Sequence, residues 1–152
     1  MGDCAIIKNK VEFETTAETF LDKIFSPVLK NNLGDIEIRT FPKGQRPGQY
    51  FCQTAKEASE ITFKLCNLGI DVYFGVNPRV GKRGKKENVH YVTAFHAEVD
   101  YGTDGHKKKP DFENYDEAIK AITNFNPQPT LINLSGGGLH CYWMLSAPVK
   151  NR

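Results

Sequence analysis

The sequence has few of the features that mark a membrane, secreted or zinc-ribbon protein. Its longest apolar runs are of strand length, whereas a membrane-spanning helix needs about 20 apolar residues. The N-terminus lacks the unbroken apolar stretch of a signal peptide. Cys4, Cys52, Cys66 and Cys141 are scattered, with no C-x-x-C pair. The sequence therefore argues against a zinc ribbon, a disulfide scaffold and a membrane partner, and it favours the reducing cytoplasm.

Charge and composition are not extreme either. The 152 residues are 25% charged and 39% hydrophobic, which is ordinary for a globular protein and long enough for one packed core. We therefore expect a single domain over residues 1–152. The net charge of +2 says little, but the basic residues are unevenly placed. Five of them fall within eight positions, namely Arg79, Lys82, Arg83, Lys85 and Lys86.

Alternation, capping signals and glycines predict an α+β fold. Thr15 or Thr16 is expected to cap a first helix that ends at Ser26-Pro27. Thr54 and Glu57 form a capping box for a second helix, which Gly69 ends. The expected apolar stripe of this helix consists of Ala58, Ile61, Leu65 and Leu68. Because the elements alternate without regular βαβ units, we expect a sheet covered by helices. The expected helices cover residues 16–25, 55–68 and 112–125, and the expected strands cover residues 35–41, 49–53, 71–76, 91–100, 130–134 and 139–145.

Two acids, Glu98 and Asp100, end the longest of these strands. Residues i and i+2 share one face of a strand, so the two carboxylates should project side by side. Phe95, Ala97 and Val99 should then point to the other face and pack into the core. Close acids repel unless a cation lies between them. Mg²⁺ and Mn²⁺ take oxygen ligands, often one or two carboxylates together with substrate phosphates. The pattern indicates a metal site; the alternative is a pair of solvated carboxylates on an outer sheet face.

A glycine-rich segment, Ser135-Gly136-Gly137-Gly138, leads into the last strand and to His140. Glycines let backbone N–H groups approach an anion closely. His140 at the end of such a turn is well placed to hold a triphosphate. The alternatives are a simple hairpin turn and a hydrogen-bonded structural histidine.

The basic segment Arg79–Lys86 is either a solvated surface loop or a loop that binds template or triphosphate. Lysine and arginine bind phosphates without reading sequence. Four aromatic residues, Tyr73, Phe74, Tyr142 and Trp143, are mostly core candidates, with base stacking left open for Tyr142.

Together these motifs resemble the primase-polymerases of phages and plasmids, within the archaeo-eukaryotic primase superfamily. The resemblance covers roughly residues 70 to 148. Its segments are Phe74-Gly75-Val76-Asn77-Pro78-Arg79, a Gly/Lys-rich loop, Ala94-Phe95-His96-Ala97-Glu98-Val99-Asp100-Tyr101-Gly102, a helix, and Leu134-Ser135-Gly136-Gly137-Gly138-Leu139-His140-Cys141-Tyr142-Trp143.

The resemblance implies a catalytic core with a sheet like that of RNA-recognition motifs. It implies that Glu98 and Asp100 bind Mg²⁺ or Mn²⁺, that His140 holds nucleotide phosphate, and that Arg79 contacts nucleotide or template. The implied reaction is template-directed nucleotidyl transfer from nucleoside triphosphates on single-stranded DNA, with a replicative helicase, fused or separate, as a partner.

Two departures from the family accompany this resemblance. Most relatives have aspartate where Glu98 stands. The third acidic motif is also missing before the chain ends, twelve residues after His140, and Asp104, Asp111 and Asp116 do not lie where it belongs. We therefore expect either the N-terminal part of a longer protein or a degraded relative. The alternatives to a polymerase are a non-catalytic module that binds nucleotides or single strands, and a metal-dependent nuclease.

Overall fold

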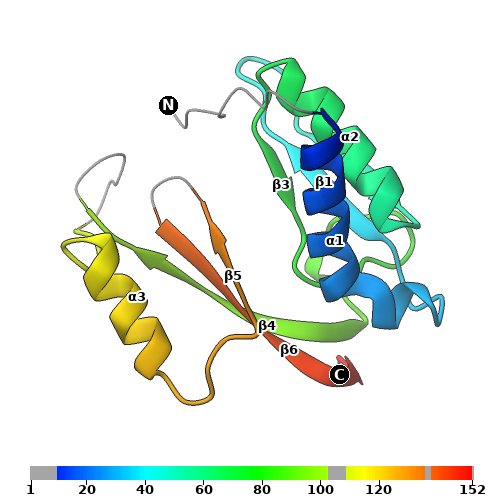
Figure 1. Cartoon of the computed structure of the whole chain (residues 1–152). Coiled ribbons are helices and arrows are strands. Elements are labelled where there is room, and N and C mark those ends of the chain that lie inside the picture. Colours follow the sequence, from blue (N-terminus) through cyan, green and yellow to red (C-terminus); the bar gives the residue numbers. More distant parts are fainter. Residues whose placement is uncertain (1–9, 103–108, 136–137, 152) are drawn as a thin grey trace. The chain divides into compact units, whose positions relative to one another are not determined.

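Two small antiparallel sheets and three helices make up the computed structural model (Figure 1). The structure describes residues 10–102, 109–135 and 138–151, with side chains from residue 16 onward. The described residues divide into two compact units. The larger unit comprises residues 10–93 and 145–151, and the smaller unit comprises residues 94–144.

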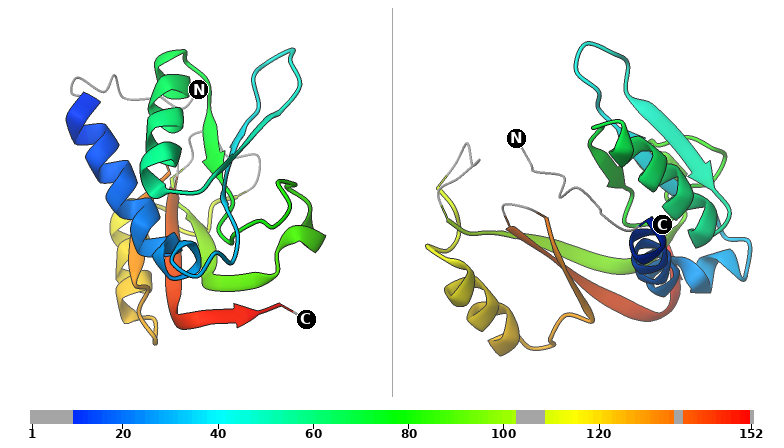
Figure 2. Two further views of the ribbon diagram at one scale, coloured as in Figure 1. Left: turned by 90° about the vertical axis from the view of Figure 1, so that its right-hand side faces the viewer. Right: turned by 45° about the horizontal axis from the view of Figure 1, so that its top comes forward.

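The larger unit is a three-stranded sheet with two helices on one side (Figure 1). The strands lie in the order β2-β1-β3, and both neighbours of β1 run antiparallel to it. Helices α1 and α2 lie side by side (Figure 2). Ile36 and Ile38 of β1 are buried with Ile24 and Phe25 of α1, and this apolar layer forms the core. The elements are α1 (Lys10–Leu29), β1 (Ile36–Thr40), β2 (Gly48–Cys52), α2 (Ala55–Asn67), β3 (Val72–Phe74) and the short 3₁₀ helix η1 (Lys86–Asn88).

Helix α2 begins where its capping residues predict. The Oγ1 atom of Thr54 accepts a hydrogen bond from the backbone N–H of Glu57 at 3.1 Å. The Oε2 atom of Glu57 accepts one from the N–H of Gln53 at 3.0 Å, which satisfies a second N–H group at this end. Gly69 follows the helix at a φ of 69°, a left-handed conformation that favours glycine.

Helix α1 differs from its expected bounds. It begins before Thr15 and continues through Pro27 instead of ending at Ser26. Phe25 and Val28 on either side of Pro27 are both fully buried. The free energy gained by burying these two side chains exceeds the cost of the backbone hydrogen bond that proline cannot make. In α2, the predicted apolar stripe is wrong at Leu68, which is exposed beyond the end of the helix.

The smaller unit is a second antiparallel sheet with one helix against it (Figure 2). Its strand order is β4-β6-β5, so β4 lies at an edge. Ala118 and Ile122 of α3 pack against Leu139 and Cys141 of β6, with Val99 of β4 beside them. Val99, Leu139 and Cys141 therefore face α3, as alternation predicts. Phe95 was expected to pack in the core as well, but its side chain is 62% exposed, so that expectation is wrong. The elements are β4 (Tyr91–Asp100), α3 (Tyr115–Asn124), β5 (Leu131–Leu134) and β6 (Gly138–Lys150).

The predicted α+β class is confirmed. The strands, however, form two sheets instead of the one sheet that the alternation of elements led us to expect. The expected single domain over residues 1–152 stays a prediction. Among the described residues, no helix has both the length and the apolar character needed to cross a membrane.

Candidate functional site

A histidine and a carboxylate from neighbouring strands meet on the face of the second sheet that α3 leaves open. The Nε2 atom of His140 on β6 lies 3.9 Å from the Oε1 atom of Glu98 on β4. The side chain of Glu98 is 66% exposed and that of His140 is 31% exposed, so a ligand in solvent could reach both. Alternation places Asp100 on this face as well, one pleat beyond Glu98. We call Glu98, Asp100 and His140 the acidic face.

Gly138 sits directly beside Asp100. A Cβ atom on Gly138 would lie 2.7 Å from the carbonyl oxygen of Val99 and 3.0 Å from Oδ1 of Asp100. No other residue fits here without moving β6 away from β4. This close approach is a reason for glycine at position 138 that is separate from any contact with phosphate.

The edge of β4 is covered by Asp111, which the sequence analysis set aside. Its Oδ2 atom accepts a hydrogen bond from the N–H of Asp100 at 3.2 Å. Its own N–H donates to the carbonyl of Asp100 at 3.0 Å. A third carboxylate therefore lies next to the acidic face. Because Asp111 lies in the irregular stretch 109–114 before α3, no periodicity in the sequence could have revealed this contact.

Two further side chains lie on the side of this sheet that faces away from α3. Asn133 of β5 pairs directly with His140, and directly opposed residues of an antiparallel pair share a face. Tyr142 is fully buried, with its ring stacked on His96 at a centroid distance of 6.3 Å. Burial raises the pKa of Tyr142 to about 12, and the charges of Glu98 and Cys141 contribute in the same direction. Tyr142 is thus a neutral core residue, as most of the aromatics were expected to be.

The acidic face offers two carboxylates to a cation. Within residues 10–102, 109–135 and 138–151, no three His, Cys, Asp or Glu side chains gather closely enough to form a complete metal site. Glu98 and Asp100 do fit Mg²⁺ or Mn²⁺ in the chemistry of their donors, since these ions prefer oxygen and take further ligands from substrate phosphates.

The glycine segment is described only at its two ends. The N–H of Ser135 donates to the carbonyl of Gly138 at 3.0 Å, which pairs the two strands at this point. The two residues between them, Gly136 and Gly137, lie outside the described part of the chain. Asp104 also lies outside it. The expected contact of this segment with phosphate stays a prediction.

The basic loop belongs to the larger unit, and its first residue has a partner inside the protein. The Nε atom of Arg79 donates to Oε2 of the buried Glu37 at 2.7 Å. Arg39 donates to Oε1 of the same carboxylate at 2.5 Å, and Gln49 donates to that atom at 3.1 Å. The remaining basic residues are exposed, namely Lys82, Arg83, Lys85 and Lys86.

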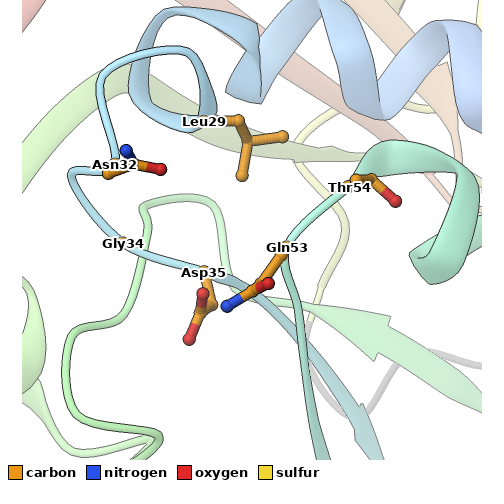
Figure 3. A pocket seen from close by; sticks show the side chains of 6 residues that line it. All are labelled: Leu29, Asn32, Gly34, Asp35, Gln53 and Thr54. Atoms are coloured by element: carbon orange, nitrogen blue, oxygen red, sulfur yellow. The ribbon is translucent and has the colours of Figure 1, made fainter.

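A cavity of about 380 Å³ also lies in the larger unit (Figure 3). Its lining is mostly polar and includes Asn32, Asp35, Gln53 and Thr54 at the start of α2. None of the residues predicted to bind metal or nucleotide lines it.

No model of a known protein family matches the chain, and neither does a curated protein or a solved structure.

Proposed function

We propose that this chain is a metal-dependent nucleotidyltransferase of the primase-polymerase type, with an RRM-like sheet as its catalytic core. The observation that carries the proposal is the 3.9 Å approach of His140 to Glu98 on the open face of the second sheet. At this distance the imidazole of His140 and a metal held by Glu98 can both reach the phosphates of one nucleotide. The motifs that resemble that family supply the rest of the argument.

In this proposal Glu98 and Asp100 hold Mg²⁺ or Mn²⁺ together with the phosphates of a nucleoside triphosphate. A metal held there would supply positive charge to offset that of the phosphates while a 3′-hydroxyl attacks in line. His140 donates a hydrogen bond to the triphosphate, and Asp111 keeps the end of β4 in place through the N–H of Asp100. The exposed basic residues of the loop attract the single-stranded DNA template.

The acids are tested with conservative variants that keep their shape. We expect template-dependent synthesis by the wild-type chain with Mg²⁺ or Mn²⁺ and nucleoside triphosphates, and its loss in Glu98→Gln and in Asp100→Asn. Asp116→Asn is the matched control, because Asp116 is an exposed acid of the same unit that lies on α3. Synthesis that survives Asp100→Asn would overturn the catalytic proposal.

A thermal shift separates this proposal from its main alternative, a non-catalytic module that binds nucleotides or single strands. The absence of a three-residue metal cluster among the described residues favours that alternative. If the chain is the proposed enzyme, a nucleoside triphosphate should raise Tm only when Mg²⁺ or Mn²⁺ is present. The rise in Tm should be smaller in Glu98→Gln than in the wild type. The alternative predicts salt-sensitive binding that neither acid affects.

A further inference from the structure

Two exposed aromatic rings lie together on the first sheet. Phe41 and Tyr73 meet edge to face, with a centroid distance of 5.5 Å and an interplanar angle of 69°. They are 52% and 53% exposed. Large aromatic side chains usually bury most of their surface, so a contacting pair this exposed is unusual. Tyr73 was expected in the core, and the structure corrects that expectation.

The pair lies on the side of the sheet that faces away from the helices. Phe74 of β3 contacts the rings of Phe20 and Phe25 of α1, so its side chain points to the helices. Its neighbour Tyr73 therefore points to the opposite side. Tyr73 pairs directly with Arg39 of β1, and Phe41 is two residues further along. We call Arg39, Phe41 and Tyr73 the outer face.

The outer face carries excess positive charge. Buried Glu37 is the single carboxylate between Arg39 and Arg79, so this group of three has a net charge of +1. The side chain of Arg39 is 34% exposed, which leaves part of its guanidinium open to solvent. Arginine binds phosphate well and also stacks on flat rings.

The basic loop is attached to this same side. The carbonyl of Gly84 accepts a hydrogen bond from Nη2 of Arg39 at 2.7 Å. A Cβ atom on Gly84 would collide with the carboxylate of Glu37, so the loop backbone rests directly on the charged group. The loop therefore starts from the same side of the sheet as the aromatic pair, and it carries exposed cations on either side of Gly84, namely Lys82, Arg83, Lys85 and Lys86.

We propose that the outer face binds single-stranded nucleic acid. Bases stack on Tyr73 and Phe41, while Arg39 and the loop cations contact the phosphates. Exposed aromatics on a sheet with cations along the backbone path are how many proteins hold unpaired strands, since every base has a flat face. A protein partner would match the two rings but not the dense positive charge beside them. The inference rests on the proposed function, because it names where the template is held.

Fluorescence anisotropy with a labelled oligothymidylate of about 12 nucleotides tests it, since such sites span about 4–16 nucleotides. Neither metal nor nucleoside triphosphate is added, so binding here and catalysis at the acidic face can fail independently. We expect Tyr73→Ala to weaken binding by about 5- to 100-fold, from the usual loss per stacked base. Tyr73→Phe keeps the ring and should keep the affinity.

Tyr50→Ala is the matched control. Tyr50 is an exposed tyrosine of the same unit, but it pairs with Ile38 and so belongs to the side of the sheet that carries the helices. We expect its affinity to equal that of the wild type. Lys85→Ala should reduce the slope of log affinity against log salt by about 0.7. A ribonucleotide strand of the same length shows whether the site distinguishes RNA from DNA.

Three results would overturn the proposal. The first is equal affinity in Tyr73→Ala and the wild type. The second is tighter binding to a duplex than to the single strand, because paired bases hide their faces. The third is a dimer that Tyr73→Ala dissociates, which would assign the face to contact between two copies of the chain. Loss of synthesis in Asp100→Asn with unchanged strand binding would support both proposals.

Discussion

Arg79 and Glu37, which are 42 positions apart in the sequence, form an ion pair with 2.7 Å between Nε and Oε2. Glu37 is fully buried, and Arg39 binds the other carboxylate oxygen. The pair joins the start of the basic loop to the central strand of the first sheet. It therefore makes the position of the loop depend on one buried charge.

We expect Glu37→Gln to lower the free energy of unfolding by about 3 kcal/mol, because two guanidinium groups lose their common counter-ion. Urea unfolding followed by circular dichroism measures this change. Glu87→Gln is the control, since Glu87 is an exposed acid of the same unit and its loss should change stability by less than about 0.5 kcal/mol. Equal stability of the two variants would show that the buried pair is not needed for folding.

Gly138→Ala should destabilise the second sheet by about 1–3 kcal/mol, because its Cβ atom would press on the carbonyl of Val99 and on Asp100. The same displacement of Asp100 should weaken metal-dependent binding of nucleoside triphosphate. Thermal unfolding with and without nucleotide measures both effects. Lys120→Ala, at an exposed position of α3 in the same unit, should leave both unchanged. A Gly138→Ala protein with wild-type Tm would contradict the tight approach of β6 to β4.

Substitutions of Asp111 test whether this third carboxylate positions Asp100 or binds the metal. If it only positions Asp100, an amide oxygen can accept the same N–H hydrogen bond. We therefore expect Asp111→Asn to retain most metal-dependent nucleotide binding and Asp111→Ala to lose about tenfold in affinity, by the usual cost of one hydrogen bond to a charged group. Titration of nucleoside triphosphate at fixed Mn²⁺ compares them. Equal losses in both variants would instead identify Asp111 as a metal ligand.

The raised pKa of Tyr142 predicts how the free energy of unfolding changes at alkaline pH. Its pKa rises from 10.0 to about 12 in the folded protein, chiefly because it is buried. Above about pH 10 the unfolded chain releases this proton and the folded chain keeps it, so the free energy of unfolding falls as pH rises. The slope approaches about 1.4 kcal/mol per pH unit.

Tyr142→Phe removes this contribution, so its stability should fall less steeply between about pH 10 and 11 than that of the wild type. Urea midpoints measured across that interval give the comparison. The pKa of Cys52 also rises, from 9.0 to about 12, but that change is common to both proteins and cancels in the difference. Parallel pH profiles would contradict the burial of the phenol.

The strands and the cap of α2 were predictable because their signals are local, whereas the cap expected at Thr15 or Thr16 lies inside α1 and is wrong. Strand β4 spans Tyr91–Asp100, as its alternation predicted, and Thr54 caps α2 as its spacing from Glu57 predicted. The errors lie where packing outweighs local preference. Pro27 lies inside α1 because its neighbours are buried, and Leu68 is exposed because α2 ends before it.

The candidate site was predictable only in part. Alternation placed Glu98 and Asp100 on one face, but it could not say which residue of another strand would lie opposite them. That depends on the register of β6 against β4, which brings His140 to Glu98. Asp111, which bonds to the edge of β4, lies in an irregular stretch with no periodic signal.

By itself, the sequence determined the kinds of elements, their order and which side chains alternate inward, because propensity, periodicity and capping act over a few neighbouring residues. Only the tertiary structure decided that Arg79 turns inward to Glu37 and that Tyr73 stays exposed beside Phe41. Those outcomes depend on strand pairing and loop closure between distant positions. The physical reason is that a side chain's partner is set by where the whole chain packs, which no local pattern records.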